Sequence, residues 1–252
     1  MKTALTVFLV VAAAVGPAAR GATPEDDVFA SHLMVDQDVV VSARITGIVE
    51  TITVDRGSVV TQGQTLATLD PRALDADVRE AKEDMDLKKA EYDRAQSLVD
   101  SKIGSVQDLD SKKAQYAVAA ARWEKAKTQR DYAVIRAPFA GVVTEKYARI
   151  GQKVIEDGDE PLFRIMSTEP LLARVYLRED WLLRVRLGET VEVVPERFPD
   201  AKTTGEVRFI SPTVDPASGT FQVMIQVRKR PGQPALRPGV AVQVRFPEVK
   251  PR

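Results

Sequence analysis

Residues 43–69 read ARITGIVETITVDRGSVVTQGQTLATL, and residues 136–165 read RAPFAGVVTEKYARIGQKVIEDGDEPLFRI. In each stretch two glycines lie ten residues apart, and a valine follows the second glycine by three. These residues are Gly47, Gly57 and Val60 in the first stretch, and Gly141, Gly151 and Val154 in the second. Agreement at several glycines and valines identifies an internal repeat and not a chance likeness between β-rich segments.

Each copy alternates β-branched and polar residues between glycines, which is the pattern of short strands in a half-buried sheet. Because a positive φ costs glycine little, we expect Gly47, Gly57, Gly141 and Gly151 to lie at turns. The two halves, residues 43–70 and 133–166, predict one small flattened barrel with pseudo-twofold symmetry.

The halves are separated by residues 71–132, which have helical character throughout. Asp70 and Pro71 favour a helix start, with the acid as cap and the proline in the first turn. Apolar or small residues recur in 4-3 spacing, interrupted by Lys88 and Lys113. They are Leu74, Val78, Ala81, Met85, Tyr92, Ala95 and Val99 in the first arm, and Val106, Leu109, Tyr116, Ala120 and Trp123 in the second.

The one clear break in this pattern is Ile103-Gly104-Ser105, where Ser105 is placed to cap the returning helix. The seam predicts two helices packed as a coiled-coil hairpin. Each arm has nearly thirty residues, so at about 1.5 Å per residue the rod is about 40 Å long. A rod of this length buries only a narrow seam, which is the geometry of an element that reaches a partner.

The C-terminal third predicts a small antiparallel barrel, because alternating segments are separated by regular turn residues. The expected strands are residues 171–177, 189–194, 205–210, 221–227 and 240–244. We expect Val39–Val41 to add a strand to it. The β-barrel domain then comprises residues 39–42 and 167–248, with residues 22–38 as an N-terminal extension.

Composition excludes several classes of function. The chain has 36 basic and 36 acidic residues, so no net charge attracts nucleic acid. It has no cysteine, which excludes disulfides, thiolate metal sites and a lipoprotein anchor. The lone His32 cannot form a multi-histidine site, and no G-x-S-x-G or phosphate-binding loop accompanies it. We therefore expect an ordinary surface or strand histidine, no enzyme activity, no cofactor and no bound metal.

The N-terminus has the features of an export signal. Lys2 precedes the apolar stretch Leu5–Val15, and Gly16-Pro17-Ala18-Ala19 supplies small residues for cleavage. The stretch is shorter than the roughly 20 residues that span a bilayer, which favours a cleaved signal peptide, residues 1–21, over a retained anchor. The expected location is the periplasm.

The two repeat halves, residues 43–70 and 133–166, resemble the lipoyl or biotinyl carrier fold. A lipoyl-like barrel that opens at its midpoint into a helical hairpin resembles the periplasmic adaptor, or membrane fusion protein, family of tripartite efflux pumps. The resemblance implies a mixed α and β, elongated fold: a barrel-sandwich hybrid split by the hairpin, followed by a β-barrel. The segments Ser211–Thr220 and Leu236–Val240 resemble that family's barrel domain. The chain stops at Arg252, where longer members continue into a membrane-proximal domain.

The family's members that dock onto TolC-type outer-membrane channels carry an arginine, a leucine four residues later and a serine seven after that. Arg94, Leu98 and Ser105 have this spacing at the hairpin tip. The resemblance implies that they contact the channel, that an inner-membrane efflux transporter of the RND type is the second partner, and that copies form a ring, hexameric by analogy. An arginine can donate several directed hydrogen bonds, and the leucine can fill an apolar groove.

Three alternatives accompany this interpretation. The chain could serve an ABC-type exporter or a type I secretion system. It could be a lipoyl or biotinyl carrier, although no Met-Lys-Met or Asp-Lys-Ala turn is present. It could handle metals through methionines, but Met34, Met85, Met166 and Met224 are scattered, and packing explains them better.

Overall fold

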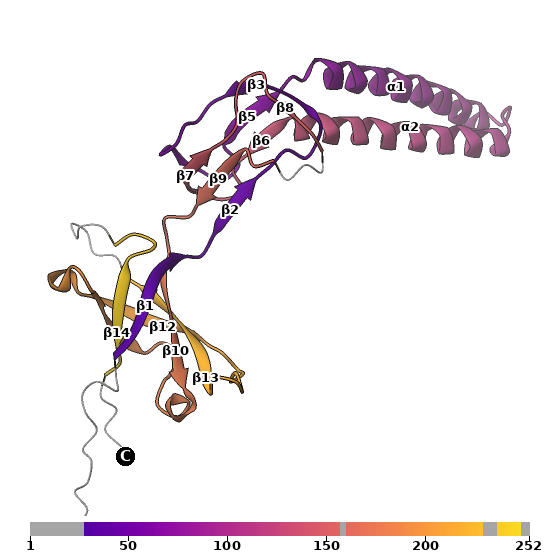
Figure 1. The fold of residues 1–252 in the computed structure, drawn as a ribbon. Helices are drawn as coiled ribbons and strands as arrows, with labels where there is room; N and C mark the ends of the chain where they lie inside the picture. The colour runs from indigo at the N-terminus through magenta and orange to yellow at the C-terminus, as the bar shows by residue number, and fades with distance from the viewer. Residues whose placement is uncertain (1–27, 157–159, 229–235, 248–252) are drawn as a thin grey trace, which may run out of the picture.

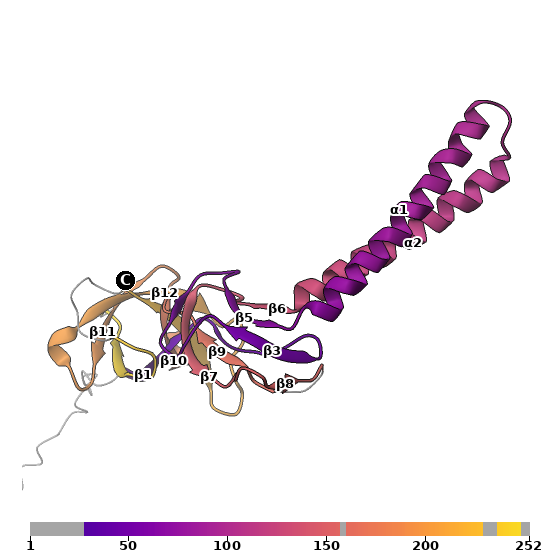
Figure 2. The same cartoon turned by 90° about the horizontal axis from the view of Figure 1, so that it is seen from above.

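The computed structural model describes residues 28–156, 160–228 and 236–247, so the expected signal peptide lies outside the described residues. Figure 1 shows an elongated molecule with a β-barrel at one end, a flattened pair of sheets in the middle and a helical hairpin beyond them. From above, the hairpin runs away from both β parts (Figure 2). The fold class predicted from the sequence is confirmed.

The central part consists of two four-stranded sheets, ordered β2-β9-β7-β4 and β6-β5-β3-β8. The first sheet contains β2 (Asp38–Val41), β9 (Phe163–Met166), β7 (Gly141–Lys146) and β4 (Val59–Val60). The second contains β6 (Val134–Arg136), β5 (Thr65–Leu69), β3 (Gly47–Ile52) and β8 (Lys153–Val154). Each sheet therefore takes strands from both halves of the repeat, and neither half can form its core alone.

The pseudo-twofold symmetry is visible in individual hydrogen bonds. The backbone N–H of Gly57 donates to the carbonyl of Val143 at 2.8 Å, and the N–H of Gly151 donates to the carbonyl of Val49 at 2.8 Å. Val49 and Val143 are equivalent in the repeat, and both are completely buried. The sequence repeat is thus a structural repeat with matching bonds across the two sheets.

The four repeat glycines have two different roles. Gly57 and Gly151 lie in turns with φ of 86° and 81°, as expected. The prediction that Gly47 and Gly141 lie at turns is wrong, because each is the first residue of a strand. A Cβ on Gly141 would lie 2.4 Å from the carbonyl oxygen of Met166 on the paired strand β9. The close approach of the β9 backbone therefore requires glycine at this position.

The prediction that Val39–Val41 joins the barrel is also wrong. These residues form β2, which pairs antiparallel with β9 in the central part. β6 pairs in the same manner with β5, so each half begins with a strand that pairs with the other half's last strand. The repeat extends upstream of the stretch that reveals it, because Val40-Val41 and Val134-Ile135 stand at the same distance before their leading glycines.

The barrel is closed by six strands in the order β1-β10-β13-β12-β11-β14. They are β1 (Val28–Val35), β10 (Leu171–Arg178), β13 (Thr220–Val227), β12 (Thr203–Ile210), β11 (Thr190–Pro195) and β14 (Ala241–Arg245). The short 3-10 helices η2 (Glu179–Trp181) and η3 (Pro199–Ala201) follow β10 and β11. β1 comes from the segment predicted to be an extension, and it carries His32 on its exposed face opposite Ala241.

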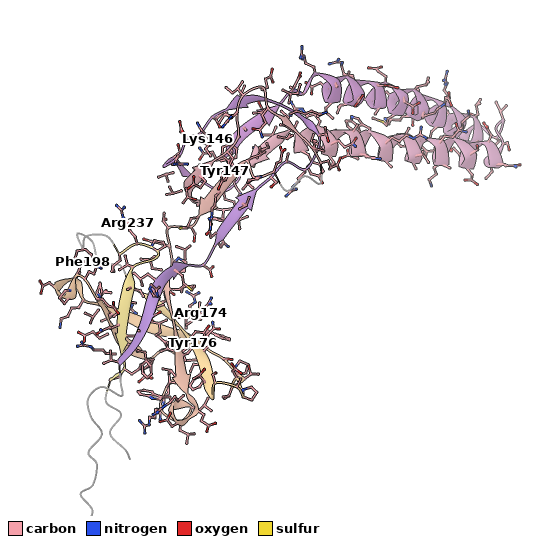
Figure 3. All side chains as sticks on the ribbon, in the orientation of Figure 1. Lys146, Tyr147, Arg174, Tyr176, Phe198 and Arg237 are labelled. Atoms are coloured by element: carbon pink, nitrogen blue, oxygen red, sulfur yellow. The ribbon has the colours of Figure 1, made fainter. Side chains whose placement is uncertain are left out.

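Alternate residues of each barrel strand enter one core, as an antiparallel sheet with one solvated face requires. On β10, Val175 and Leu177 are buried, whereas Arg174 and Tyr176 point outward (Figure 3). The five strands predicted in this third of the chain are all present within one or two residues at each end. β1 completes the closure.

Candidate functional site at the hairpin tip

The hairpin consists of α1 (Arg72–Asp100) and α2 (Val106–Tyr132), which run antiparallel and contact each other from the Arg130–Asp75 pair near the base to the stacked rings of Tyr92 and Tyr116. Every predicted seam residue of α1, including Lys88, is buried or half-buried. Met85 and Ala95 on α1 and Ala119 and Ala126 on α2 are the fully buried members.

On α2 the predicted seam is half wrong. The residues that face α1 follow the 3-4 spacing Leu109, Lys112, Tyr116, Ala119, Trp123 and Ala126. Val106 and Lys113, which the prediction placed in the seam, are exposed. In a heptad pattern the next seam residue after Leu109 can be three or four positions later, at Lys112 or at Lys113. In the structure it is Lys112, which forms an ion pair with Glu91 of α1.

A polar layer lies in the half of this seam that is nearer to the tip. The Nζ atom of Lys112 lies 3.0 Å from the Glu91 carboxylate, and that of Lys88 lies 3.4 Å from it. Beside them Tyr92 and Tyr116 stack across the seam, with ring centroids 6.0 Å apart. The hydrogen bond from Lys112 lowers the pKa of Glu91 below its ordinary value. The pair contributes to register between the helices as well as to stability.

At the base of the hairpin, Arg130 Nε donates to the Asp75 carboxylate at 3.0 Å and links the two helices. Pro71 is itself the N-cap of α1 and not a first-turn residue, and no side chain caps that position. The Asp70 carboxylate instead accepts from the side chain and the backbone N–H of Arg72. These hydrogen bonds lower the pKa of Asp70 to about 2.

The tip is a tight and well-defined turn. Lys102 has a φ of 63°, and the N–H groups of Ile103 and Gly104 both donate to the carbonyl of Leu98, at 2.9 and 3.0 Å. A Cβ on Gly104 would lie 2.8 Å from the backbone nitrogen of Val99. The turn is therefore fixed by the end of α1, in the manner of a left-handed C-cap.

The predicted docking residues all lie at or near this turn. Arg94 and Leu98 are one helical turn apart and line the same shallow depression with Asp93, Ser97 and Ser101. Among the described residues Arg94 has no carboxylate partner, and its Nε donates to the Ala90 carbonyl at 3.2 Å. Ser105 occupies the N-cap position of α2, but its side chain makes no capping hydrogen bond. The hydroxyl of Ser105 is thus free to bond elsewhere.

Sequence reasoning missed two residues of this surface. Ile103 is 80% exposed and Val106 is 62% exposed, and they flank Gly104 beside the half-exposed Leu98. The available signal was an apolar residue on each side of the lone glycine of the helical segment. An ordered rod that ends in three exposed apolar side chains and an unpaired guanidinium has the composition of a protein-binding surface.

The family model for the CzcB-like, barrel-sandwich hybrid domain matches residues 37–166, which is more than half of the chain. The chain belongs to the membrane fusion protein family, whose members are adaptors of efflux systems. A second family model, for the CusB-like beta-barrel domain, matches residues 173–250. The two matches cover the two β parts of the adaptor, and the first also contains the hairpin.

Individual relatives are distant. The adaptor is 25% identical over 224 residues to the cobalt-zinc-cadmium resistance protein CzcB of Cupriavidus metallidurans, covering 83% of this chain and 42% of the relative. It is 25% identical over 202 residues to the macrolide export protein MacA of Escherichia coli O157:H7, covering 69% and 54%. The chain thus spans about half the length of the curated relatives it matches.

A solved structure supports the fold independently. The membrane fusion protein Spr0693 of Streptococcus pneumoniae R6 superposes with a TM-score of 0.70 at 20% identity, covering 88% of this chain and 99% of that one. Neither α1 nor α2 of the adaptor, the long helices of the described residues, has the continuous apolar stretch needed to cross a bilayer.

Proposed function

We propose that this adaptor links an inner-membrane RND-type efflux transporter to a TolC-type outer-membrane channel in the periplasm, and so supports export of small molecules. The observation that carries the proposal is the hairpin tip, where Arg94, Leu98 and Ser105 lie on exposed surface at the end of a rod about 40 Å long. The energy for transport comes from the transporter, and the adaptor provides contacts alone.

The chemistry of the tip fits the helical end of a channel subunit. An unpaired guanidinium can make paired hydrogen bonds to carboxylates or to the free carbonyls at a helix C-terminus. Leu98, Ile103 and Val106 can enter the apolar spaces between helices. The names of the relatives, a cation resistance protein and a macrolide export protein, support export as the process.

Self-association into a ring, hexameric by family analogy, is part of the proposal. Side-by-side packing of the lipoyl-like parts would cover the exposed apolar residues Val39, Val40, Ile48 and Val59. Crosslinking between copies through cysteines placed at these positions in cells tests the ring. Crosslinking from the barrel identifies the inner-membrane partner, and capture of an ABC-type exporter would replace the RND assignment.

The decisive experiment on the tip is Arg94→Glu in cells that depend on the pump. Reversing the charge opposes the contacts that the guanidinium makes, so we expect export to fall by roughly tenfold or more. The matched control is Arg79→Glu, which is on the same helix, is also exposed and has no ion-pair partner among the described residues. Unchanged export by Arg94→Glu at normal protein levels would contradict tip docking.

A further inference from the structure

The loop between β10 and β11, residues 179–189, lies at one end of the barrel. We name it the leucine loop. Trp181 and Val185 point inward and belong to the barrel core. The Trp181 ring meets Phe29 edge-on at 5.3 Å and contacts Phe246 at 5.3 Å. These three aromatic rings pack together and anchor the loop to the barrel core.

The other face of the leucine loop is apolar and exposed. Leu183 is 93% exposed, more than any other large apolar side chain among the described residues, and Leu187 is 67% exposed; Leu182 lies beside them. The backbone is well ordered, because the N–H groups of Arg184 and Val185 donate to the Trp181 carbonyl at 2.9 and 3.0 Å. Single exposed leucines are ordinary, but three within six residues on a fixed turn indicate a surface that is covered in use.

The leucine loop lies at the end of the molecule opposite the hairpin tip. Strand pairing shows this: Leu171 of β10 lies beside Val35 at the junction with the central part, and Arg178 lies at the far end. Val28, where β1 begins, pairs with Arg245 at that same far end (Figure 1).

The charges around the leucines suit phosphate groups. Arg184 and Arg186 flank Leu183 and Leu187, and neither has a carboxylate partner among the described residues. The guanidinium of Arg184 lies 5.5 Å from the centre of the Trp181 ring. The acids of the loop are placed differently: Asp180 pairs with Arg178 at 3.3 Å, the Glu189 carboxylate accepts the backbone N–H of Arg186 at 3.0 Å, and Glu179 is exposed at the start of the loop.

We propose that the leucine loop inserts Leu183 and Leu187 into the interface of a phospholipid bilayer, with Arg184 and Arg186 at the level of the headgroup phosphates. Leucines provide the apolar area, and arginine stems can follow them while the charged ends stay in the polar region. The contact would hold the barrel end of the adaptor against the membrane from which the hairpin points away. It needs neither the transporter nor the channel, so it can be tested separately from the proposed function.

The absence of cysteine from the chain allows a local test. Leu183→Cys in the exported chain is labelled with an environment-sensitive dye and mixed with phosphatidylethanolamine vesicles containing a minority of phosphatidylglycerol. We expect dye emission to rise roughly twofold or more, with quenching by lipids that carry a spin label near the headgroup. Leu98→Cys at the hairpin tip is the control. A dye at this position should show neither the rise in emission with vesicles nor quenching by spin-labelled lipids.

A second pair of variants measures the strength of the contact. Leu183→Asp combined with Leu187→Asp should lower vesicle partitioning roughly tenfold or more, because two apolar anchors are lost. Leu87→Asp, at a half-exposed leucine of α1, should leave it unchanged. Unaltered thermal melting of the double variant separates this loss from unfolding, since neither leucine is in the core.

Two results overturn the proposal. One is a dye at position 183 whose emission is not quenched by vesicles that contain the spin-labelled lipids. The other is a double variant that binds vesicles normally but loses export in cells, which would assign the leucine loop to a protein partner.

Discussion

The lipoyl-like part and the hairpin bury their apolar residues in opposite ways. In the first, Val49, Val143 and Phe163 are completely buried, and each sheet is assembled from both halves of the repeat. In the hairpin, two helices share a single seam, of which only Met85, Ala95, Ala119 and Ala126 are fully covered. The shared core of the lipoyl-like part favours cooperative unfolding of that whole part, which is the base of the hairpin. The hairpin extends far from the base but buries little apolar surface, so we expect it to be able to unfold without the rest of the molecule.

The largest expected effect tests that contrast directly. Phe163→Ala removes a completely buried ring and should destabilise the lipoyl-like part by about 3–5 kcal/mol. Met85→Ala should destabilise the hairpin by about 2 kcal/mol and leave the β parts intact. Hydrogen exchange measured by mass spectrometry distinguishes the two. Global loss of protection in Met85→Ala would show that the hairpin and base unfold together.

A smaller effect tests the symmetry of the base. Gly57→Ala and Gly151→Ala each force an alanine into a positive φ at equivalent turns, and nothing lies within 4 Å to clash with the added Cβ. Both substitutions should therefore cost about 1–2 kcal/mol, from backbone strain alone. Denaturant unfolding checks this equality. Clearly unequal losses would mean that the two turns are not energetically equivalent, despite their matching hydrogen bonds.

The smallest effect concerns acid and the polar layer of the hairpin. Because the pKa of Glu91 is lowered, its pair with Lys112 stabilises the hairpin fully above the ordinary glutamate pKa, and the contribution is lost as pH falls through the lowered value. Thermal melts followed by far-ultraviolet circular dichroism report mainly on α1 and α2. We expect the helical transition to move to lower temperature on acidification.

Glu91→Gln should remove part of that acid dependence. Glu124→Gln is the matched control, because Glu124 pairs with Lys127 on its own helix and not across the seam. Equal acid dependence in the Glu91→Gln variant and the unaltered chain would refute a role for the ion pair between the helices.

Much of the fold could be predicted from sequence, because its signals are local or repeated. Glycine spacing revealed the two halves, heptads revealed the hairpin, and alternation revealed five of the six barrel strands. The placement of Val39–Val41 could also have been found, since Ala43 and Ala137 continue the same alignment upstream. The tip residues Ile103 and Val106 were missed because an exposed apolar residue looks the same in sequence as a buried one.

The α2 seam marks the limit of sequence reasoning. Lys112 and Lys113 are both lysine, and Ala119 and Ala120 are both alanine, so the two possible heptad frames are nearly identical in composition. Val106 favours one frame and Ala126 the other. The choice depends on which residue meets Glu91 and Tyr92 of the opposite helix.

By itself the sequence determined the order of parts: a repeat of short strands, a helical insertion at its midpoint and a barrel after it. Periodicity and glycine positions encode these features within each segment. Only the tertiary structure decided which strands exchange between sheets, which face of α2 is covered, and that Leu183 and Ile103 lie exposed at opposite ends. Those outcomes depend on contacts between residues far apart in the chain, and no local pattern records such contacts.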